Sequence, residues 1–474
     1  MISYFRNYGF SRLPVLFIIL LLLRLPMFFA GIPLTIPELT WLTVGEKVAN
    51  GFVMYRDVWE NLEPLSVAVY HTIHLLFGKS ETAYRIIALF LVFVQAYFLN
   101  EIYNMQQARE KTTLPALFYI IFSFLYFDFL TLSPMLMGLT FILVMLYYVF
   151  YLMRSPEDYE KVLYLGLSAG MAMMFYYPAA VFFIFIFLTL VIYTPANLAK
   201  VLLLLSGFLL PMAIAAVYFF WFDGLRDFYH NFIITPFSLQ RFRYVENETL
   251  ILVFAVPLLV TVLSFFVSTG AGGKTNYQTN VIKVTFLYLI LAAVAFVFFT
   301  RTITTNQLYI FLPGIVIYTA FAMQQLRNRR LQEFSFWFTV FLVVLVSYGS
   351  LYDFAVRSDL ADNDHLIADR EALHEHFTGK NVWTTGDDRD IYLDNTLGMP
   401  YLNMVLAERH FNRLHSFQVL SEVYENFIRH RPEVIDDQGG LMPDIFMRIP
   451  VLENEYKQWA EDERVYIRTD LEID

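Results

Sequence analysis

The sequence lacks cysteine and has few charged residues. None of its 474 residues is cysteine, which excludes a disulfide framework, a thiolate metal site and a thiol nucleophile. Charged residues make up 16% of the chain, compared with about 25% in an ordinary soluble domain. Hydrophobic residues make up 58%, and they include 49 Phe and 31 Tyr. This composition excludes both a soluble globular protein and a disordered chain.

The net charge of −10 is distributed unevenly along the chain. Residues 356–474 contain 25 Asp and Glu but 12 Lys and Arg, which gives this part a net charge of −13. Residues 1–355 carry a net charge of +3. We therefore expect a transmembrane domain over residues 1–355 and an acidic, extracytoplasmic soluble domain over residues 356–474.

Long apolar stretches predict an α-helical polytopic membrane protein. A membrane-spanning helix needs about 20 apolar residues, and about eleven stretches meet this requirement. They lie near residues 13–31, 86–104, 113–132, 134–153, 161–176, 178–195, 199–221, 248–268, 281–300, 307–324 and 334–353. Basic residues concentrate in every second loop, which predicts a cytoplasmic N-terminus and a C-terminal domain on the outer, periplasmic side.

Two parts of the chain outside these stretches have a predicted structure of their own. In the first outer loop, residues 32–85, we expect interfacial helices over residues 36–50, ending at Gly51, and over residues 65–77. In the C-terminal part, strands are expected at 381–383 and 434–435, and helices at 398–410, 416–430 and 450–460. These elements predict a small α/β domain.

The first outer loop also carries an ordered set of motifs. They are Glu38, Gly51, Tyr55-Arg56-Asp57, Trp59, Pro64-Leu65, Leu76-Phe77-Gly78 and Arg85. In this order they resemble the first outer loop of the GT-C superfamily glycosyltransferases, which include the protein O-mannosyltransferases and the lipid A aminoarabinose transferases. The resemblance extends over about residues 10–355.

The resemblance implies an inverting membrane glycosyltransferase of the cell envelope. Its donor would be a polyprenyl-phosphate-linked sugar, and its acceptor an unknown glycan, lipid or protein at the outer face of the membrane. A carboxylate of the first outer loop would deprotonate the acceptor, while basic side chains or a divalent metal ion would hold the leaving phosphate. Membrane lipid is the other expected partner, no nucleic acid is expected, and the family suggests the bacterial inner membrane.

Glu38 is the first candidate for a catalytic residue. The family usually has an Asp-Glu pair at this point, whereas this sequence has Pro37-Glu38. Glu38 is therefore the remaining carboxylate of the pair and a candidate base. A structural alternative is a capping box, in which Thr35 and Glu38 satisfy the start of the following helix.

Other carboxylates of the same loop are further candidates. Glu60 is the second candidate catalytic residue, and Asp57 and Glu63 are candidate substrate-binding residues. The alternative for all three is an ordinary solvated position. Since Glu63 precedes Pro64, its backbone is expected to be extended.

Several arginines are candidates for binding the donor phosphate. Arg24 interrupts the first apolar stretch, where a charge is costly unless it is paired or functional, and Asp128 is the alternative partner. The other candidates on the outer side are Arg56, Arg241, Arg243 and Arg301. A contact with lipid headgroups is the alternative for each of them.

The sequence is compatible with three functions. The first is the glycosyltransferase. The second is a catalytically inactive protein of the same fold that binds lipid-linked glycan or scaffolds an envelope complex, and the replacement of Asp by Pro37 favours it. The third is a transporter, which is disfavoured because the sequence has no internal repeat and no paired helices broken by Gly or Pro.

Overall fold

The structure is a computed structural model that describes residues 2–106, 111–235, 241–270, 275–352, 365–369, 376–386 and 389–471. The chain forms two compact units. The helical unit comprises Met1–Ile32, Thr82–Ile214 and Gln240–His365. The α/β unit comprises Pro33–Glu81, Ala215–Leu239 and Leu366–Asp474. The expected domain boundary at residues 355 and 356 lies outside the described residues.

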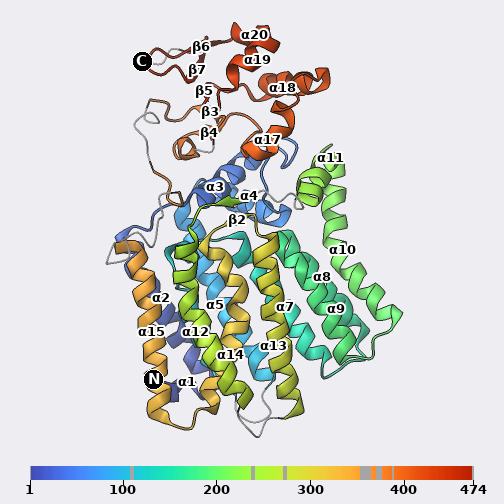
Figure 1. Ribbon diagram of the computed structural model, residues 1–474, viewed down its shortest axis with the longest axis vertical. Coiled ribbons are helices and arrows are strands. Elements are labelled where there is room, and N and C mark those ends of the chain that lie inside the picture. The colour runs from blue at the N-terminus through green and yellow to red at the C-terminus, as the bar shows by residue number, and fades with distance from the viewer. Residues whose placement is uncertain are drawn as a thin grey trace. The chain divides into compact units, whose positions relative to one another are not determined.

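Eight helices in the described ranges are long and apolar enough to cross a membrane (Figure 1). They are α2 (Leu13–Ala30), α5 (Glu81–Met105), α7 (Pro134–Leu152), α10 (Leu198–Trp221), α12 (Asn247–Gly270), α13 (Asn276–Val294) with its π-helical extension Ala295–Phe299, α14 (Leu312–Gln325) with the preceding 3-10 helix Thr305–Phe311, and α15 (Arg329–Tyr352). The prediction of a polytopic α-helical protein is confirmed, and the number of eleven spans stays a prediction.

Shorter elements complete the helical unit. They are α1 (Ile2–Phe5), α6 (Leu114–Phe122), α8 (Tyr159–Phe175), α9 (Phe182–Tyr193), the 3-10 helices Phe10–Arg12, Phe127–Leu130 and Tyr177–Val181, and the two-residue strands β1 (Phe242–Arg243) and β2 (Thr302–Ile303). The stretch expected to be helical over 113–132 is interrupted after α6. Its second part turns through the Phe127–Leu130 helix, where the Asp128 side chain accepts the Asn306 N–H at 2.9 Å.

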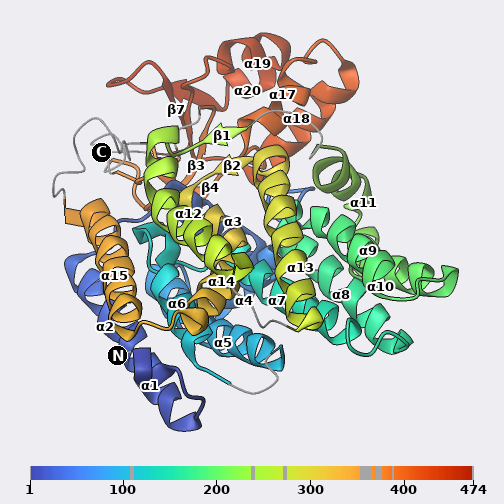
Figure 2. The same ribbon diagram turned by 60° about the horizontal axis from the view of Figure 1, so that its bottom comes forward.

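Close packing holds the helical unit together, as the two views in Figures 1 and 2 show for α7 and α8 and for α12 and α14. Helices α8 and α10 approach each other at glycines. A Cβ atom on Gly166 would lie 2.2 Å from the Leu204 carbonyl oxygen, and one on Gly207 would lie 2.4 Å from that of Leu163. Backbone-to-backbone contact of this kind needs small residues and stabilises helix pairs in membranes.

The α/β unit is built on a five-stranded sheet with the order β4-β3-β5-β7-β6. Its strands are β3 (Asn381–Thr384), β4 (Thr396–Leu397), β5 (Val434–Asp436), β6 (Tyr456–Gln458) and β7 (Val465–Arg468). Strand β3 runs parallel to both β4 and β5, whereas β7 is antiparallel to β5 and β6. The predicted strands at 381–383 and 434–435 are thereby confirmed as parts of β3 and β5.

The helices that accompany the sheet agree with the sequence in part. They are α17 (Met404–Phe411), α18 (Phe417–His430), α19 (Met442–Arg448) and α20 (Pro450–Glu453), together with the 3-10 helix Asp390–Tyr392. The helix predicted over 416–430 is confirmed, and the one over 398–410 begins six residues later than expected, with Asn403 as its cap. The helix over 450–460 is wrong in its second half, because residues 456–458 pair with β7.

The first outer loop folds with this sheet. Its helices are α3 (Ile36–Ala49) and α4 (Pro64–Phe77), which confirm the predicted helices over 36–50 and 65–77. The Ile36 N–H donates to the Leu366 carbonyl at 2.9 Å, and Ala368 N–H donates to Leu34 at the same distance. Trp59 belongs to the buried core formed with Trp383 and other apolar side chains of the C-terminal part. The segment Leu225–Phe228 (α11) and the π-helix Tyr229–Ile234 also belong to the α/β unit.

Candidate functional site

The candidate residues of the first outer loop lie in a tight turn with an unusual backbone. Tyr55 is fully buried and has a φ of 70°, a region that bulky L-residues rarely adopt. Its N–H donates to the Val58 carbonyl at 2.9 Å, and its hydroxyl donates to that of Leu62 at 2.5 Å. Backbone strain of this kind costs about 1–3 kcal/mol and persists where the surroundings enforce it. The turn fixes the two charged residues that follow Tyr55.

Asp57 is buried and paired with two arginines. Arg56 reaches its carboxylate at 2.8 Å and Arg429 at 3.0 Å. The carboxylate also accepts the Val53 N–H at 2.9 Å, and its hydrogen bond with Arg56 raises the pKa of that guanidinium. Arg56 additionally donates to the Phe222 carbonyl at 2.6 Å. Asp57 and Arg56, both predicted to bind substrate, therefore bind each other.

Glu60 is likewise buried and compensated. The Arg389 guanidinium lies 3.0 Å from its Oε2 atom, and the Asn403 side chain donates to Oε1 at 3.0 Å. The N–H of Asn61 donates to the same Oε1 at 2.8 Å. Arg389 is held in turn by a 2.9 Å hydrogen bond to the Thr40 hydroxyl of α3. The Glu60 carboxylate is thus held by one guanidinium group and two further hydrogen-bond donors of the same unit.

A third arginine covers Trp59. The Arg409 guanidinium lies 3.7 Å from the centre of the Trp59 ring and donates to the Asn231 side-chain oxygen at 2.9 Å. Asp227 lies 3.6 Å from it. Burial lowers the pKa of Arg409 and raises that of Asp227. This cation–π contact links α17 to the first outer loop and to the segment 215–239 of the same unit.

Glu38 and Glu63 mark the starts of the two loop helices. Glu38 is 1% exposed, and its N–H donates to the Thr35 hydroxyl at 3.3 Å, so Thr35 caps α3. Glu63 is the residue before the first turn of α4 and has an extended backbone, with φ −75° and ψ 145°, as its position before Pro64 predicts. Thr35 caps α3 through the Glu38 backbone, and the role of the Glu38 carboxylate as a base stays a prediction.

The carboxylates of this loop do not suit a divalent metal ion. Asp57 and Glu60 already face arginines, whose positive charge opposes a second cation at the same oxygens. Within the described ranges, no three His, Asp or Glu side chains lie close enough together to hold a metal.

The helical unit contains a different polar cluster, centred on Arg24. Arg24 is fully buried in α2, and its Nη2 donates to the Ser123 carbonyl at 3.4 Å. The Tyr309 hydroxyl donates to the Ser123 and Phe129 carbonyls at 3.2 and 3.0 Å. Two further nitrogens of Arg24, Nε and Nη1, are buried and make no hydrogen bond with any residue that the structure describes. Buried polar groups are normally satisfied, so this guanidinium has capacity for an anion.

Asp128 lies in the same unit but does not pair with Arg24. Its carboxylate accepts hydrogen bonds from the Thr305 hydroxyl and from the Asn306 N–H. Over the described ranges, no carboxylate forms an ion pair with Arg24. The alternative of a structural Arg24–Asp128 pair is therefore not found.

The remaining candidate arginines meet at a short ribbon of the helical unit. Strands β1 and β2 pair in parallel, with Phe242 opposite Thr302 and Arg243 opposite Ile303. The Phe242 N–H donates to the Arg301 carbonyl at 2.9 Å. This register brings Arg241, Arg243 and Arg301 together, with the first two exposed. Arg241 and Arg243 thus present two exposed guanidinium groups suited to phosphate, whereas two guanidinium nitrogens of Arg301 are buried.

Sequence reasoning missed the partners that come from distant parts of the chain. Arg389, Arg409, Arg429 and Asn403 were not singled out, although each contacts the first outer loop or the segment 215–239 within the α/β unit. The sequence held a weak signal for these partners, because Lys and Arg are outnumbered by Asp and Glu in residues 356–474. Tyr309 and Thr305 were also missed as neighbours of the two intramembrane charges.

Comparison with known proteins gives a likeness in fold. No protein-family model matches the sequence, and no curated protein matches it. The structure is similar to that of ArnT from Cupriavidus metallidurans bound to undecaprenyl phosphate, with a TM-score of 0.56 and 11% identity, over 97% of this chain and 98% of that one. It also matches the apo oligosaccharyltransferase of Archaeoglobus fulgidus, with a TM-score of 0.43 and 11% identity, over 72% of this chain. This chain spans about half of that protein, 55% of its length.

The likeness to ArnT covers nearly the whole of both chains, and eight helices of this chain are suited to crossing a membrane. The chain is an integral membrane protein. It shares its fold with ArnT, which agrees with the resemblance of its first outer loop to the GT-C superfamily.

Proposed function

We propose that this chain is a membrane glycosyltransferase that transfers a sugar from a polyprenyl-phosphate-linked donor to an acceptor at the outer face of the membrane. The observation that carries the proposal is the buried guanidinium of Arg24, two of whose nitrogens have no partner among the described residues. An uncompensated cation inside an apolar helical unit is costly, and it persists where a ligand supplies the opposite charge. The fold shared with a protein that binds undecaprenyl phosphate supports a lipid-linked phosphate as that ligand.

Arg24 and the ribbon arginines have the proposed role of binding phosphate. When the bond between the anomeric carbon and the phosphate oxygen breaks, the electron pair goes to that oxygen. Fixed guanidinium groups stabilise the charge that develops there. Arg24 would be the buried contact, and Arg241, Arg243 and Arg301 would hold the phosphate on its approach or departure.

Glu38 has the proposed role of the base. The acceptor hydroxyl attacks the anomeric carbon, its proton passes to the Glu38 carboxylate, and the configuration at that carbon is inverted. Glu38 is the remaining carboxylate of the motif pair and lies buried at the start of α3. Asp57 and Glu60 are each held by arginine. Glu60 and Asp57 would therefore position the loop, and Glu63 would contact substrate at the start of α4.

The alternative is a catalytically inactive protein that binds lipid-linked glycan or scaffolds an envelope complex. The pairing of Asp57 and Glu60 favours it, because it reduces the number of carboxylates available as a base. We place either protein in the bacterial inner membrane, as the family resemblance suggests. The distribution of basic residues predicts a cytoplasmic N-terminus and a periplasmic C-terminal domain.

The test is transfer from a radiolabelled polyprenyl-phosphate sugar by the full chain in lipid nanodiscs, with a membrane lipid extract as the source of acceptors. Glu38→Gln should reduce the rate at least 100-fold while leaving the melting temperature unchanged. Glu453→Gln, at an exposed position of α20, is the matched control and should retain full activity. Donor binding without turnover by the wild-type protein would reject the transferase and support the inactive alternative.

A further inference from the structure

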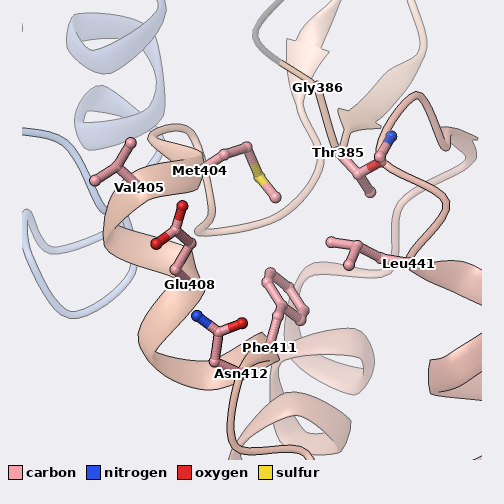
Figure 3. A pocket seen from close by; sticks show the side chains of 9 residues that line it. Thr385, Gly386, Met404, Val405, Glu408, Phe411, Asn412 and Leu441 are labelled. Carbon is pink, nitrogen blue, oxygen red and sulfur yellow. The ribbon is translucent and has the colours of Figure 1, made fainter.

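The α/β unit contains a pocket that the proposed reaction does not use. It has a volume of about 290 Å³ and lies between the ends of β3 and β5 on one side and helix α17 on the other (Figure 3). Its lining consists of Thr385, Gly386, Met404, Val405, Glu408, Phe411, Asn412, Gly439 and Leu441. This volume is close to the lower end of the range for small-molecule sites, roughly 300–1,000 Å³.

The position of the pocket follows from the order of the strands. After β3 the chain enters β4 on one side, and it then returns to β5 on the other side of β3. All three strands are parallel, so their carboxyl ends lie at one edge of the sheet. In open α/β sheets, ligands bind in the crevice at such a reversal of strand order. Thr385 directly follows β3, and Gly439 follows β5 by three residues.

The floor of the pocket is rigid and internally satisfied. The Thr385 hydroxyl donates to Asp437 at 2.8 Å and accepts the Gly439 N–H at 2.8 Å. Asp437 also accepts the N–H groups of Leu441 and Met442 at 2.8 and 2.9 Å. A Cβ atom on Gly439 would lie 2.9 Å from the Thr385 carbonyl oxygen, so glycine permits the close approach of the two loops.

The wall of the pocket supplies the groups that would select a ligand. Figure 3 shows Met404, Glu408, Phe411 and Asn412 on one side, facing Thr385 and Leu441 on the other. Glu408 and Asn412 are four residues apart and therefore lie on one face of α17. Both are exposed, and in the described structure neither side chain makes an internal hydrogen bond or ion pair.

These groups match the chemistry of a sugar ring. A carboxylate and an amide side by side accept and donate hydrogen bonds to neighbouring hydroxyls, and the apolar surfaces of Phe411 and Met404 can cover the C–H face of the ring. One carboxylate and no basic side chain are among the nine lining residues, which disfavours phosphate and favours a neutral or amino sugar. We propose that this crevice binds a single neutral or amino pyranose unit. Binding needs no turnover, so the proposal is independent of the transferase function.

The test is binding of methyl β-glucoside, glucosamine and glucose 6-phosphate to the full chain in nanodiscs, measured by saturation-transfer NMR with empty nanodiscs as the background. Methyl β-glucoside and glucosamine should bind saturably, and glucose 6-phosphate at least 10-fold more weakly. Glu408→Gln should weaken glucosamine binding about 10-fold, because it removes a charge-assisted hydrogen bond, and Asn412→Ala should weaken both sugars. Glu425→Gln, at an exposed position of the neighbouring helix α18, is the control and should bind like wild type.

Four results would overturn the proposal. Three of them are the absence of saturable binding of either sugar, equal binding by Glu408→Gln, Asn412→Ala and the control, and tighter binding of glucose 6-phosphate. Sugar binding lost in Glu38→Gln but retained in Glu408→Gln would place the sugar elsewhere and would also overturn it. Sugar binding by a wild-type protein without transfer activity would reject the proposed transferase and keep this site.

Discussion

Two buried charged sites, one in each unit, differ in how their charge is compensated. In the α/β unit, the buried carboxylates Asp57 and Glu60 each face at least one guanidinium group, at distances of 2.8–3.0 Å. In the helical unit, Arg24 is equally buried, yet its described contacts are a long hydrogen bond to Ser123 and the neighbouring Tyr309 hydroxyl. Removing one partner of a buried ion pair is strongly destabilising, and a buried charge without a counterion is costly unless a ligand supplies one. This difference supports the proposed phosphate-binding role of Arg24 and is consistent with a structural role for Asp57 and Glu60.

The largest effect is expected when Arg24 is replaced by methionine. Removing the guanidinium should reduce transfer from the polyprenyl-phosphate donor 1,000-fold or more, which corresponds to about 4 kcal/mol. The melting temperature of the ligand-free protein should not fall, because the substitution removes a buried charge without a counterion. Arg327→Met, at an exposed position, is the control. If Arg24→Met lost much stability but kept its transfer activity, Arg24 would have a structural role and not a phosphate-binding one.

The opposite pattern is expected for Arg389. Arg389→Met leaves the buried Glu60 carboxylate without its guanidinium and should destabilise the α/β unit by about 3 kcal/mol, measured by denaturant unfolding of the full chain. Adding Glu60→Gln should restore part of this loss. Arg464→Gln breaks an exposed ion pair with Asp462 and should cost less than about 1 kcal/mol. If Arg389→Met and Arg464→Gln lowered the free energy of unfolding equally, the ion pair of Glu60 with Arg389 would not stabilise the unit.

A smaller, pH-dependent effect is expected for His430, at the end of α18. Its ring stacks on Phe52 at 4.9 Å, and both ring nitrogens are buried without a hydrogen-bond partner in the described residues. Burial, together with the nearby Lys47, lowers the pKa of His430 to about 3. The unfolded chain takes up this proton near pH 6.5 and the folded chain near pH 3. The stabilisation is therefore complete above pH 6.5 and is lost as the pH falls toward 3.

The linkage gives a measurable difference between variants. Between pH 7 and pH 5, wild type should lose about 2 kcal/mol of stability relative to His430→Phe, which cannot take up the proton. The measurement is the free energy of unfolding at the two pH values. His415→Phe, at an exposed position, controls for the loss of an imidazole. A pH dependence that is the same in wild type and His430→Phe would contradict a buried, neutral His430.

The sequence could predict the parts of the fold that depend on local patterns. Apolar stretches predicted the long helices, Gly51 marked the end of α3, and Pro64 predicted the extended backbone of Glu63 before α4. The partners in the α/β unit could not be predicted in this way. Glu60 and Arg389 are 329 positions apart in the sequence and meet because the first outer loop folds with the C-terminal sheet. Pairing over such a separation depends on tertiary packing, which a single sequence does not encode in its local periodicity.

The same limit applies to the helical unit. Arg24 was singled out because a charge in an apolar stretch is conspicuous, but its lack of a counterion required the structure. Asp128 looked like its partner in the sequence, and the Thr305–Phe311 segment takes its carboxylate instead. A 3-10 segment that breaks the hydrophobic pattern supplies these donors, and sequence periodicity gave no sign of the pairing.

The most direct test of the Arg24 assignment is the change in melting temperature of the full chain in nanodiscs when undecaprenyl phosphate or undecaprenol is added. Both lipids share the polyprenyl chain, and they differ in the phosphate. We expect undecaprenyl phosphate to raise the melting temperature of wild type well above the effect of undecaprenol, and Arg24→Met to abolish this difference. Equal shifts with the two lipids in wild type, or a difference that survives in Arg24→Met, would contradict the claim that this guanidinium binds the phosphate.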